Sequence, residues 1–147
     1  MEAAKIDKAL ALAKPKLLRL IDANLNRLKE GIRVVEDIYR YIFDKKDIAS
    51  RLKELRHIAK ISEYETLLKS RDIKNDVLKE STQSEKERTK LEDILVANFK
   101  RAQESARVLE ESFKLIDHEM AEKFKYIRYE LYDLEKSVLN ITPSQDS

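Results

Sequence analysis

Turn-forming residues and cysteine are scarce in this chain of 147 residues, which has one glycine, two prolines and no cysteine. So few turn residues favour long helices over a sheet of many strands. One glycine also excludes the Gly-rich phosphate loops of most nucleotide enzymes. With no cysteine and no signal-like segment, a reducing cytoplasmic location is expected.

Charge of one sign and long apolar runs are lacking too. Lys plus Arg is 30 against 28 for Asp plus Glu, a net charge of +2. This balance provides no bulk attraction to nucleic acid or to an anionic membrane, so any anion site must be local. No run of about 18 apolar residues exists to span a membrane. We therefore expect a protein that acts on small molecules, with neither nucleic acid nor membrane as a partner.

One stretch of the chain occurs twice. Residues 23–36 and 97–110 share the pattern A-N-x-x-R-x-x-E-x-x-R-V-x-E, 74 positions apart. The identical polar pairs are Asn24/Asn98, Arg27/Arg101, Glu30/Glu104, Arg33/Arg107 and Glu36/Glu110. Copies that change their apolar residues but keep their polar ones indicate polar groups with a shared task. The alternative is a recent duplication of a salt-bridged helix.

Helical spacing of apolar residues predicts an all-α domain over 15–140, with an N-terminal arm (1–14) and a disordered tail (141–147). Helices are expected at about 15–43, 85–115 and 118–139, with another carrying Ile48 to Ile61 and a short one at 64–69. The segments 52–57 and 124–129 also align with each other. Each half is therefore predicted to be a long helix followed by a second helix that runs back along it. Two such hairpins would form a pseudo-twofold bundle.

Two positions on the first helix stand out. Asn24 falls on the apolar stripe, and Gly31 lies about 20° from it around the helix. A small residue there allows a close approach, either by a partner helix or by a ligand.

Six arginines recur in both halves: Arg27, Arg33, Arg56, Arg101, Arg107 and Arg128. The planar guanidinium matches phosphate oxygens bidentately, so these are candidate phosphate ligands. The alternative is that each arginine pairs with a glutamate on the helix surface.

Acidic residues gather in the long aperiodic stretch 70–83. Asp72 and Asp76, with Glu80 or Glu85, could hold Mg²⁺, which takes few protein ligands and keeps its waters. Solvated loop acids give the same pattern. His57 and His118 lack metal-ligand spacing.

Four runs carry a resemblance to a known family: I-D-A-N-L-N-R-L-K-E-G-I-R-V-V-E-D (21–37), L-R-H (55–57), R-D-I-K-N-D-V (71–77) and A-N-F-K-R-A-Q-E-S-A-R-V-L-E-E (97–111). In this order they resemble the monofunctional hydroxymethylpyrimidine phosphate kinases of thiamin biosynthesis. Those enzymes occur alone or fused to thiamin-phosphate synthase. The standalone form is expected here, because a synthase barrel typically takes about 250 residues.

The resemblance implies transfer of the γ-phosphoryl group of ATP to 4-amino-5-hydroxymethyl-2-methylpyrimidine phosphate, with Mg²⁺ as cofactor. We assign Arg27, Arg101 and Asp72 to catalysis, and Asp72 and Asp76 to Mg²⁺. The residues expected to bind substrate are Asn24, Glu30, Arg33, Arg56, His57, Arg71, Asn98, Glu104, Arg107 and Arg128. The segment 71–84 is expected to be a mobile loop that orders over the phosphates.

Both expected substrates contain an aminopyrimidine ring and phosphate. Asn24 and Asn98 could each pair with one amino edge, as asparagine pairs with adenine. Equally, both could cap or bridge helices inside the bundle.

Two other functions stay open beside the kinase. One is a pyrimidine-phosphate-binding module without chemistry, which turnover of MgATP with the pyrimidine phosphate would exclude. The other is a structural bundle whose repeated polar residues set a dimer interface. The expected partners are the two substrates, a second copy of the chain and thiamin-phosphate synthase.

Overall fold

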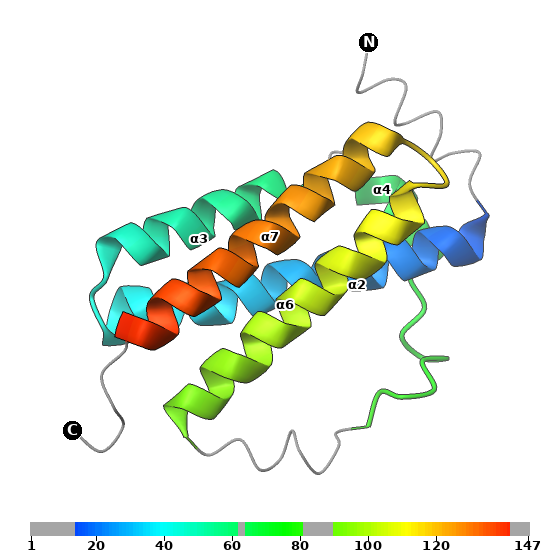
Figure 1. Cartoon of the computed structure of the whole chain (residues 1–147). Coiled ribbons are helices and arrows are strands. Elements are labelled where there is room, and N and C mark those ends of the chain that lie inside the picture. The colour runs from blue at the N-terminus through cyan, green and yellow to red at the C-terminus, as the bar shows by residue number, and fades with distance from the viewer. Residues whose placement is uncertain (1–13, 62–63, 81–89, 142–147) are drawn as a thin grey trace.

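All regular structure in the described part of the chain is helical, as predicted. The computed structural model describes residues 14–61, 64–80 and 90–141. Within these ranges the helices are α2 (Pro15–Asp37), α3 (Lys46–Ile58), α4 (Tyr64–Ser70), α6 (Leu91–Phe113) and α7 (His118–Ile141), with a π-helical turn η1 (Ile38–Ile42) after α2 (Figure 1). Most of the expected arm and most of the expected tail lie outside the described residues.

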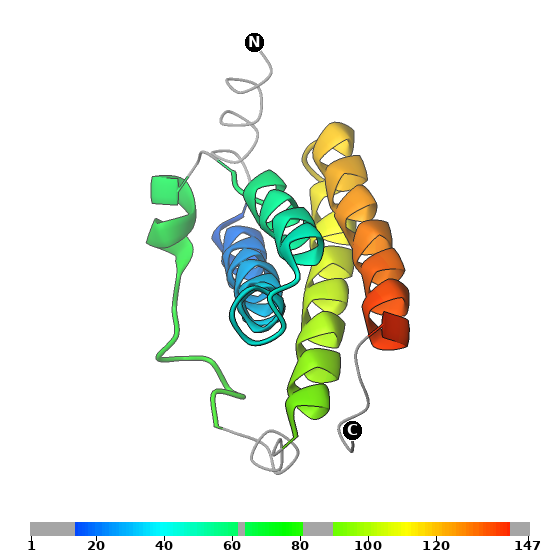
Figure 2. The ribbon, with the colours of Figure 1, turned by 90° about the vertical axis from the view of Figure 1, so that its left-hand side faces the viewer.

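The two motif copies lie on α2 and α6, which make the most extensive helix contact in the fold. Helix α3 packs on α2, α7 packs on α6, and α3 also touches α7 (Figure 2). Helix α4 lies against α2, on the side away from α6. Each motif helix is therefore followed by a helix that packs against it. The pseudo-twofold relation between the halves stays a prediction.

Local sequence explains several helix ends. Pro15 begins α2, where its missing N–H would have no partner within the helix. After η1, Asp44 adopts a left-handed φ of 52°, which aspartate tolerates better than most residues. The predicted break between the helices expected at 85–115 and 118–139 is confirmed, and it ends at Asp117. Asp117 Oδ1 accepts the backbone N–H of Glu119 at 3.1 Å, as an N-cap does.

Two predicted helix boundaries are wrong. Helix α3 ends at Ile58, so Ile61 lies beyond it, although Ile61 still packs partly buried on the core. The helix expected from residue 85 begins at Leu91, because Lys90 is extended with φ −100° and ψ 145°. Acidic residues in the first turn of α6 complement the positive end of the helix dipole there. Residues 85–89 of the expected helix lie outside the described residues.

The core is contributed by the faces of α2, α3, α6 and α7 that the apolar spacing predicted. Its largest fully buried side chains include Ile21, Leu28, Ile32, Leu52, Leu95, Phe99, Leu109, Phe113, Phe124 and Ile127. Phe113 and Phe124 stack with ring centroids 5.4 Å apart, which joins the end of α6 to α7. None of the helices in the described ranges combines the length and the apolar character that crossing a membrane requires.

Gly31 lies at a close approach between α2 and α6. A Cβ at this position would lie 3.1 Å from the carbonyl oxygen of Asn98 and 3.4 Å from the Cβ of Ala102. Of the two explanations for a small residue here, a partner helix is the one that the geometry supports.

We expect Gly31→Ala to lower the free energy of unfolding by about 1 kcal/mol. Alanine is the better helix former, but the added methyl group meets the backbone of a packed helix, which cannot move aside as a flexible side chain would. Urea denaturation followed by circular dichroism measures the change. Ser50→Ala, at an exposed position of α3, reports the helix-propensity gain without a clash. Increased stability of Gly31→Ala would contradict the close contact.

Candidate functional site

A cleft of about 420 Å³ opens between α2 and α6 where the two motif copies meet. It is lined by Asn24, Arg27, Ala97, Lys100, Arg101, Glu104, Ser105 and Val108. This volume is typical of small-molecule sites. Three of the lining side chains are cationic and one is a carboxylate, so the cleft favours an anionic ligand.

Arg27 and Arg101 are the two arginines of the cleft. Both are exposed, and neither makes an ion pair or hydrogen bond within the described residues. A guanidinium without a protein partner keeps its five N–H donors for a ligand. One arginine comes from each motif copy. The packing of α2 on α6 therefore brings two guanidinium groups that lack a partner among the described residues into one cleft.

The other two motif arginines lie outside this cleft. Arg33 Nε is 3.2 Å from Asp37 Oδ1, and Arg107 Nη2 is 3.2 Å from Glu111 Oε1. Both pairs join residues one helical turn apart on the surface, where such pairs contribute only about 0.3–0.5 kcal/mol. The surface-pairing alternative thus describes Arg33 and Arg107. His57 and Glu30 are exposed and do not line the cleft either.

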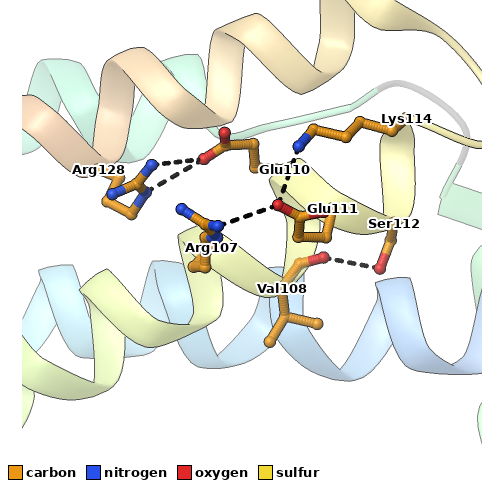
Figure 3. A network of polar contacts seen from close by, with 7 residues as sticks. All are labelled: Arg107, Val108, Glu110, Glu111, Ser112, Lys114 and Arg128. Atoms are coloured by element: carbon orange, nitrogen blue, oxygen red, sulfur yellow. Dashed lines mark hydrogen bonds and ion pairs between the residues drawn. The ribbon is translucent and has the colours of Figure 1, made fainter.

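The last two repeated arginines bridge helices. Arg56 Nε donates to Glu36 Oε1 at 2.7 Å. Arg128 Nη2 donates to Glu110 Oε1 at 2.9 Å, as Figure 3 shows. The hydrogen bond to Glu36 raises the pKa of Arg56 above its ordinary value. Both glutamates are the final residue of a motif copy. Equivalent ion pairs in the two halves therefore join α3 to α2 and α7 to α6. Arg56 and Arg128 therefore have a structural partner already.

Asn24 and Asn98 are both buried, and the place of Asn24 on the apolar stripe predicted this for Asn24. The Nδ2 atom of Asn24 donates to the carbonyl of Leu20 at 2.9 Å, and that of Asn98 donates to the carbonyl of Ile94 at 2.8 Å. Of the two, Asn24 lines the cleft.

The segment after α4 is attached to the start of α2. Arg71 Nε and Nη2 donate to the two carboxylate oxygens of Asp22, each at 2.8 Å, and Arg19 Nη2 donates to the carbonyl of Asp72 at 2.8 Å. Asp22 is buried and lies two residues before Asn24. Arg71, expected to bind substrate, thus holds its segment against a helix of the cleft.

The two loop aspartates make local hydrogen bonds. Asp72 accepts from the side chain and backbone N–H of Asn75, and these hydrogen bonds lower the pKa of Asp72. Asp76 Oδ1 accepts from the N–H of Leu78 at 2.9 Å. Within 14–61, 64–80 and 90–141, no group of three acidic, histidine or cysteine side chains is gathered for a metal ion. Glu85 lies outside these ranges.

We expect Asp22→Asn to release the 71–80 segment. The bidentate bond to Arg71 would lose its charge assistance, which typically contributes about 1.5–3 kcal/mol. Cleavage by a lysine-specific protease at Lys74 and Lys79 should then become roughly ten times faster, as measured by mass spectrometry of the fragments. Asp37→Asn removes an exposed pair on the same helix and serves as the control. Equal cleavage rates in both variants would refute the anchoring.

A second hollow of about 360 Å³ lies between the end of α2 and the start of α3. Among its lining residues are Arg40, Lys46 and Lys53, together with the motif residue Glu36. The carboxylate of Glu36 is already bound by Arg56, and no motif arginine lines this hollow. The cleft between α2 and α6 is therefore the better candidate site.

Sequence reasoning missed Lys100 and Asp22. Lys100 lines the cleft, but the equivalent position of the first motif copy is Asn26, so the repeat contains no signal for it. The partnership of Asp22 with Arg71 spans 49 positions of the chain and has no local signature.

Together, the fold and the cleft define an all-helical protein in which two copies of one motif place an arginine each in the same cleft. The chain matches the ThiD2 family over residues 19–137 and belongs to that family. No solved structure matches it.

Curated relatives carry the name thiamine-phosphate synthase. The protein of Synechococcus sp. (strain CC9605) is 40% identical over 131 residues, which cover 87% of this chain and 37% of the relative. That of a strain of Prochlorococcus marinus is 42% identical over 126 residues, covering 84% and 36%. That of a strain of Synechocystis sp. is 38% identical over 124 residues, covering 84% and 36%. The chain thus spans little more than a third of these relatives.

Proposed function

We propose that this protein is a phosphotransferase of thiamin biosynthesis that converts 4-amino-5-hydroxymethyl-2-methylpyrimidine phosphate and ATP to the pyrimidine diphosphate and ADP. The observation that carries the proposal is the pair of free arginines, Arg27 and Arg101, in one cleft. Membership of the ThiD2 family and relatives named for thiamine phosphate support the pathway. The kinase resemblance of the sequence supports the reaction.

Positioning and charge neutralisation are the roles that this reaction asks of the protein. The acceptor is a phosphate that is already ionised at neutral pH, so no strong general base is required. Arg27 and Arg101 would bind the phosphate oxygens and stabilise the charge that develops during transfer. Lys100 also lines the cleft, with its Nζ 4.0 Å from Glu135 Oε2. The γ-phosphoryl group leaves ATP, its bond to an oxygen of the acceptor phosphate forms, and ADP is released.

Asp72 and Asp76 remain the proposed Mg²⁺ ligands. The carboxylate of Asp72 is ionised at neutral pH, as aspartates ordinarily are, and Mg²⁺ in phosphoryl-transfer sites needs only one or two carboxylates besides phosphate oxygens and water. The absence of a three-residue acidic group among the described residues is therefore compatible with this cofactor. Bound Mg²⁺ would supply charge neutralisation at the phosphates. The segment 71–80 would bring Asp72 to them.

The test is incubation of the protein with MgATP and the pyrimidine monophosphate, followed by chromatographic assay for the diphosphate. Omission of Mg²⁺ and omission of each substrate are the controls. Diphosphate formation supports the proposal. Tight binding of the pyrimidine monophosphate without ATP turnover would overturn it in favour of a non-catalytic binding module.

Two partners belong to the proposal. A thiamin-phosphate synthase would consume the diphosphate, and the names of the relatives support that connection. A homodimer is the second, and size-exclusion chromatography with light scattering tests it.

A further inference from the structure

The two motif asparagines share one internal hydrogen bond but have different surroundings. Each donates from Nδ2 to the carbonyl four residues earlier in its helix. Asn24 faces the cleft beside Arg27, Arg101 and Ser105. The backbone oxygen of Asn98 instead lies where Gly31 brings α2 against α6, and Asn98 does not line the cleft. One of the two repeated amides is therefore available to a ligand there.

The bond to Leu20 sets which way the Asn24 amide points. One Nδ2 hydrogen is held by the Leu20 carbonyl, while Oδ1 and the second hydrogen make no hydrogen bond within the described residues. Rotating the amide by 180° would place Oδ1 against the carbonyl oxygen of Leu20, two acceptors in contact. Asn24 therefore presents an acceptor and an adjacent donor in a fixed order.

An acceptor beside a donor matches an exocyclic amine next to an unprotonated ring nitrogen. This is the edge of a 4-aminopyrimidine and of adenine, and asparagine reads adenine in this way in other proteins. A 4-oxopyrimidine presents the reverse order, a carbonyl beside a ring N–H. Because the Asn24 amide cannot rotate, its Nδ2–H donor would face the ring N–H, and its Oδ1 acceptor would face the carbonyl oxygen. Neither contact can form a hydrogen bond, and both groups would remain unsatisfied.

We propose that Asn24 is the residue that selects an aminopyrimidine ring in the cleft between α2 and α6, while Arg27 and Arg101 bind the phosphates attached to that ring. The proposal rests on the proposed function for the identity of the ligand, which is either ATP or the pyrimidine phosphate. The sequence alone led us to expect that Asn24 and Asn98 would each bind the ring of one substrate. The proposal assigns ring recognition to Asn24 alone.

Equilibrium binding tests this selection without turnover. Isothermal titration calorimetry would measure the Kd of 4-amino-5-hydroxymethyl-2-methylpyrimidine phosphate and of its 4-oxo analogue, and separately of adenylyl imidodiphosphate and its inosine analogue. The wild-type protein should prefer the amino compound in at least one pair. Asn24→Ala should weaken that amino compound by about tenfold to a hundredfold, leave the oxo compound unchanged and so remove the preference.

Asn98→Ala is the matched control, because it removes the same internal hydrogen bond from the equivalent motif position. We expect it to reduce stability as Asn24→Ala does and to keep the amino preference. The pair of ligands that loses its preference in Asn24→Ala identifies the ring that is read. The proposal is overturned if wild-type protein shows no preference in either pair, if Asn24→Ala keeps it, or if Asn98→Ala loses it equally.

Failure of the proposed function would look different from failure of this inference. If the wild-type protein forms no diphosphate but Asn24→Ala loses the amino preference, only the kinase activity is refuted. If diphosphate forms and Asn24→Ala keeps the preference, ring selection by Asn24 is refuted and the kinase activity stands.

Discussion

Replacement of Arg27 or Arg101 by alanine is expected to lower kcat/KM for diphosphate formation by roughly 30- to 1,000-fold, equivalent to about 2–4 kcal/mol of transition-state stabilisation. Each arginine has no protein partner in the described residues and lines the cleft. Its removal therefore takes away ligand contacts without leaving a buried charge unpaired. Steady-state kinetics with a coupled ADP assay measures the effect.

The motif contains its own controls for this experiment. Arg33→Ala and Arg107→Ala delete the other arginine of each copy, and both of these pair with acids on the exposed surface. They should leave kcat/KM within about twofold of wild type, because surface pairs of this kind contribute little. Arg27→Lys and Arg101→Lys keep the charge but lose the planar fork, so intermediate rates are expected. Wild-type turnover in folded Arg27→Ala and Arg101→Ala would rule out the assigned roles.

Replacement of Arg128 by methionine is expected to destabilise the fold by about 3–5 kcal/mol, the usual cost of removing one partner from a buried ion pair. Both side chains are 8% exposed, and Arg128 Nε and Nη2 both donate to Glu110 Oε1, at 3.1 and 2.9 Å. Without Arg128 the Glu110 carboxylate would be buried between α6 and α7 without a cation. Urea denaturation monitored by circular dichroism measures the loss of stability.

The double variant Glu110→Gln/Arg128→Met measures the interaction free energy between the two side chains. It should be clearly more stable than the sum of the single changes, because no unpaired charge remains. The equivalent Arg56→Met is expected to destabilise the fold by a similar amount, because it leaves the Glu36 carboxylate, only 1% exposed, without its cation. Additive effects of the two single changes at Glu110 and Arg128 would contradict a coupled buried pair.

The repeat in the sequence contained both the residues of the cleft and those of the ion pairs, but it could not separate the two groups. Asn24, Arg27 and Arg101 lie together in the cleft, whereas Arg33, Arg56, Arg107 and Arg128 have acidic partners. The sequence did contain a signal for two of these ion pairs. Glu36 recurs as Glu110 and Arg56 recurs as Arg128, so an ion pair between successive helices could have been proposed from their joint repetition.

The sequence by itself determined the all-helical fold class, the buried stripes and the break at Asp117, because apolar periodicity and capping are properties of neighbouring residues. Tertiary structure alone decided three further features. These are the contact of Gly31 with α6, the attachment of Arg71 to Asp22, and the convergence of Arg27 and Arg101 in one cleft. Each depends on the rotation and separation of helices that are distant in the chain, and the 3.6-residue period of a single helix does not specify either quantity.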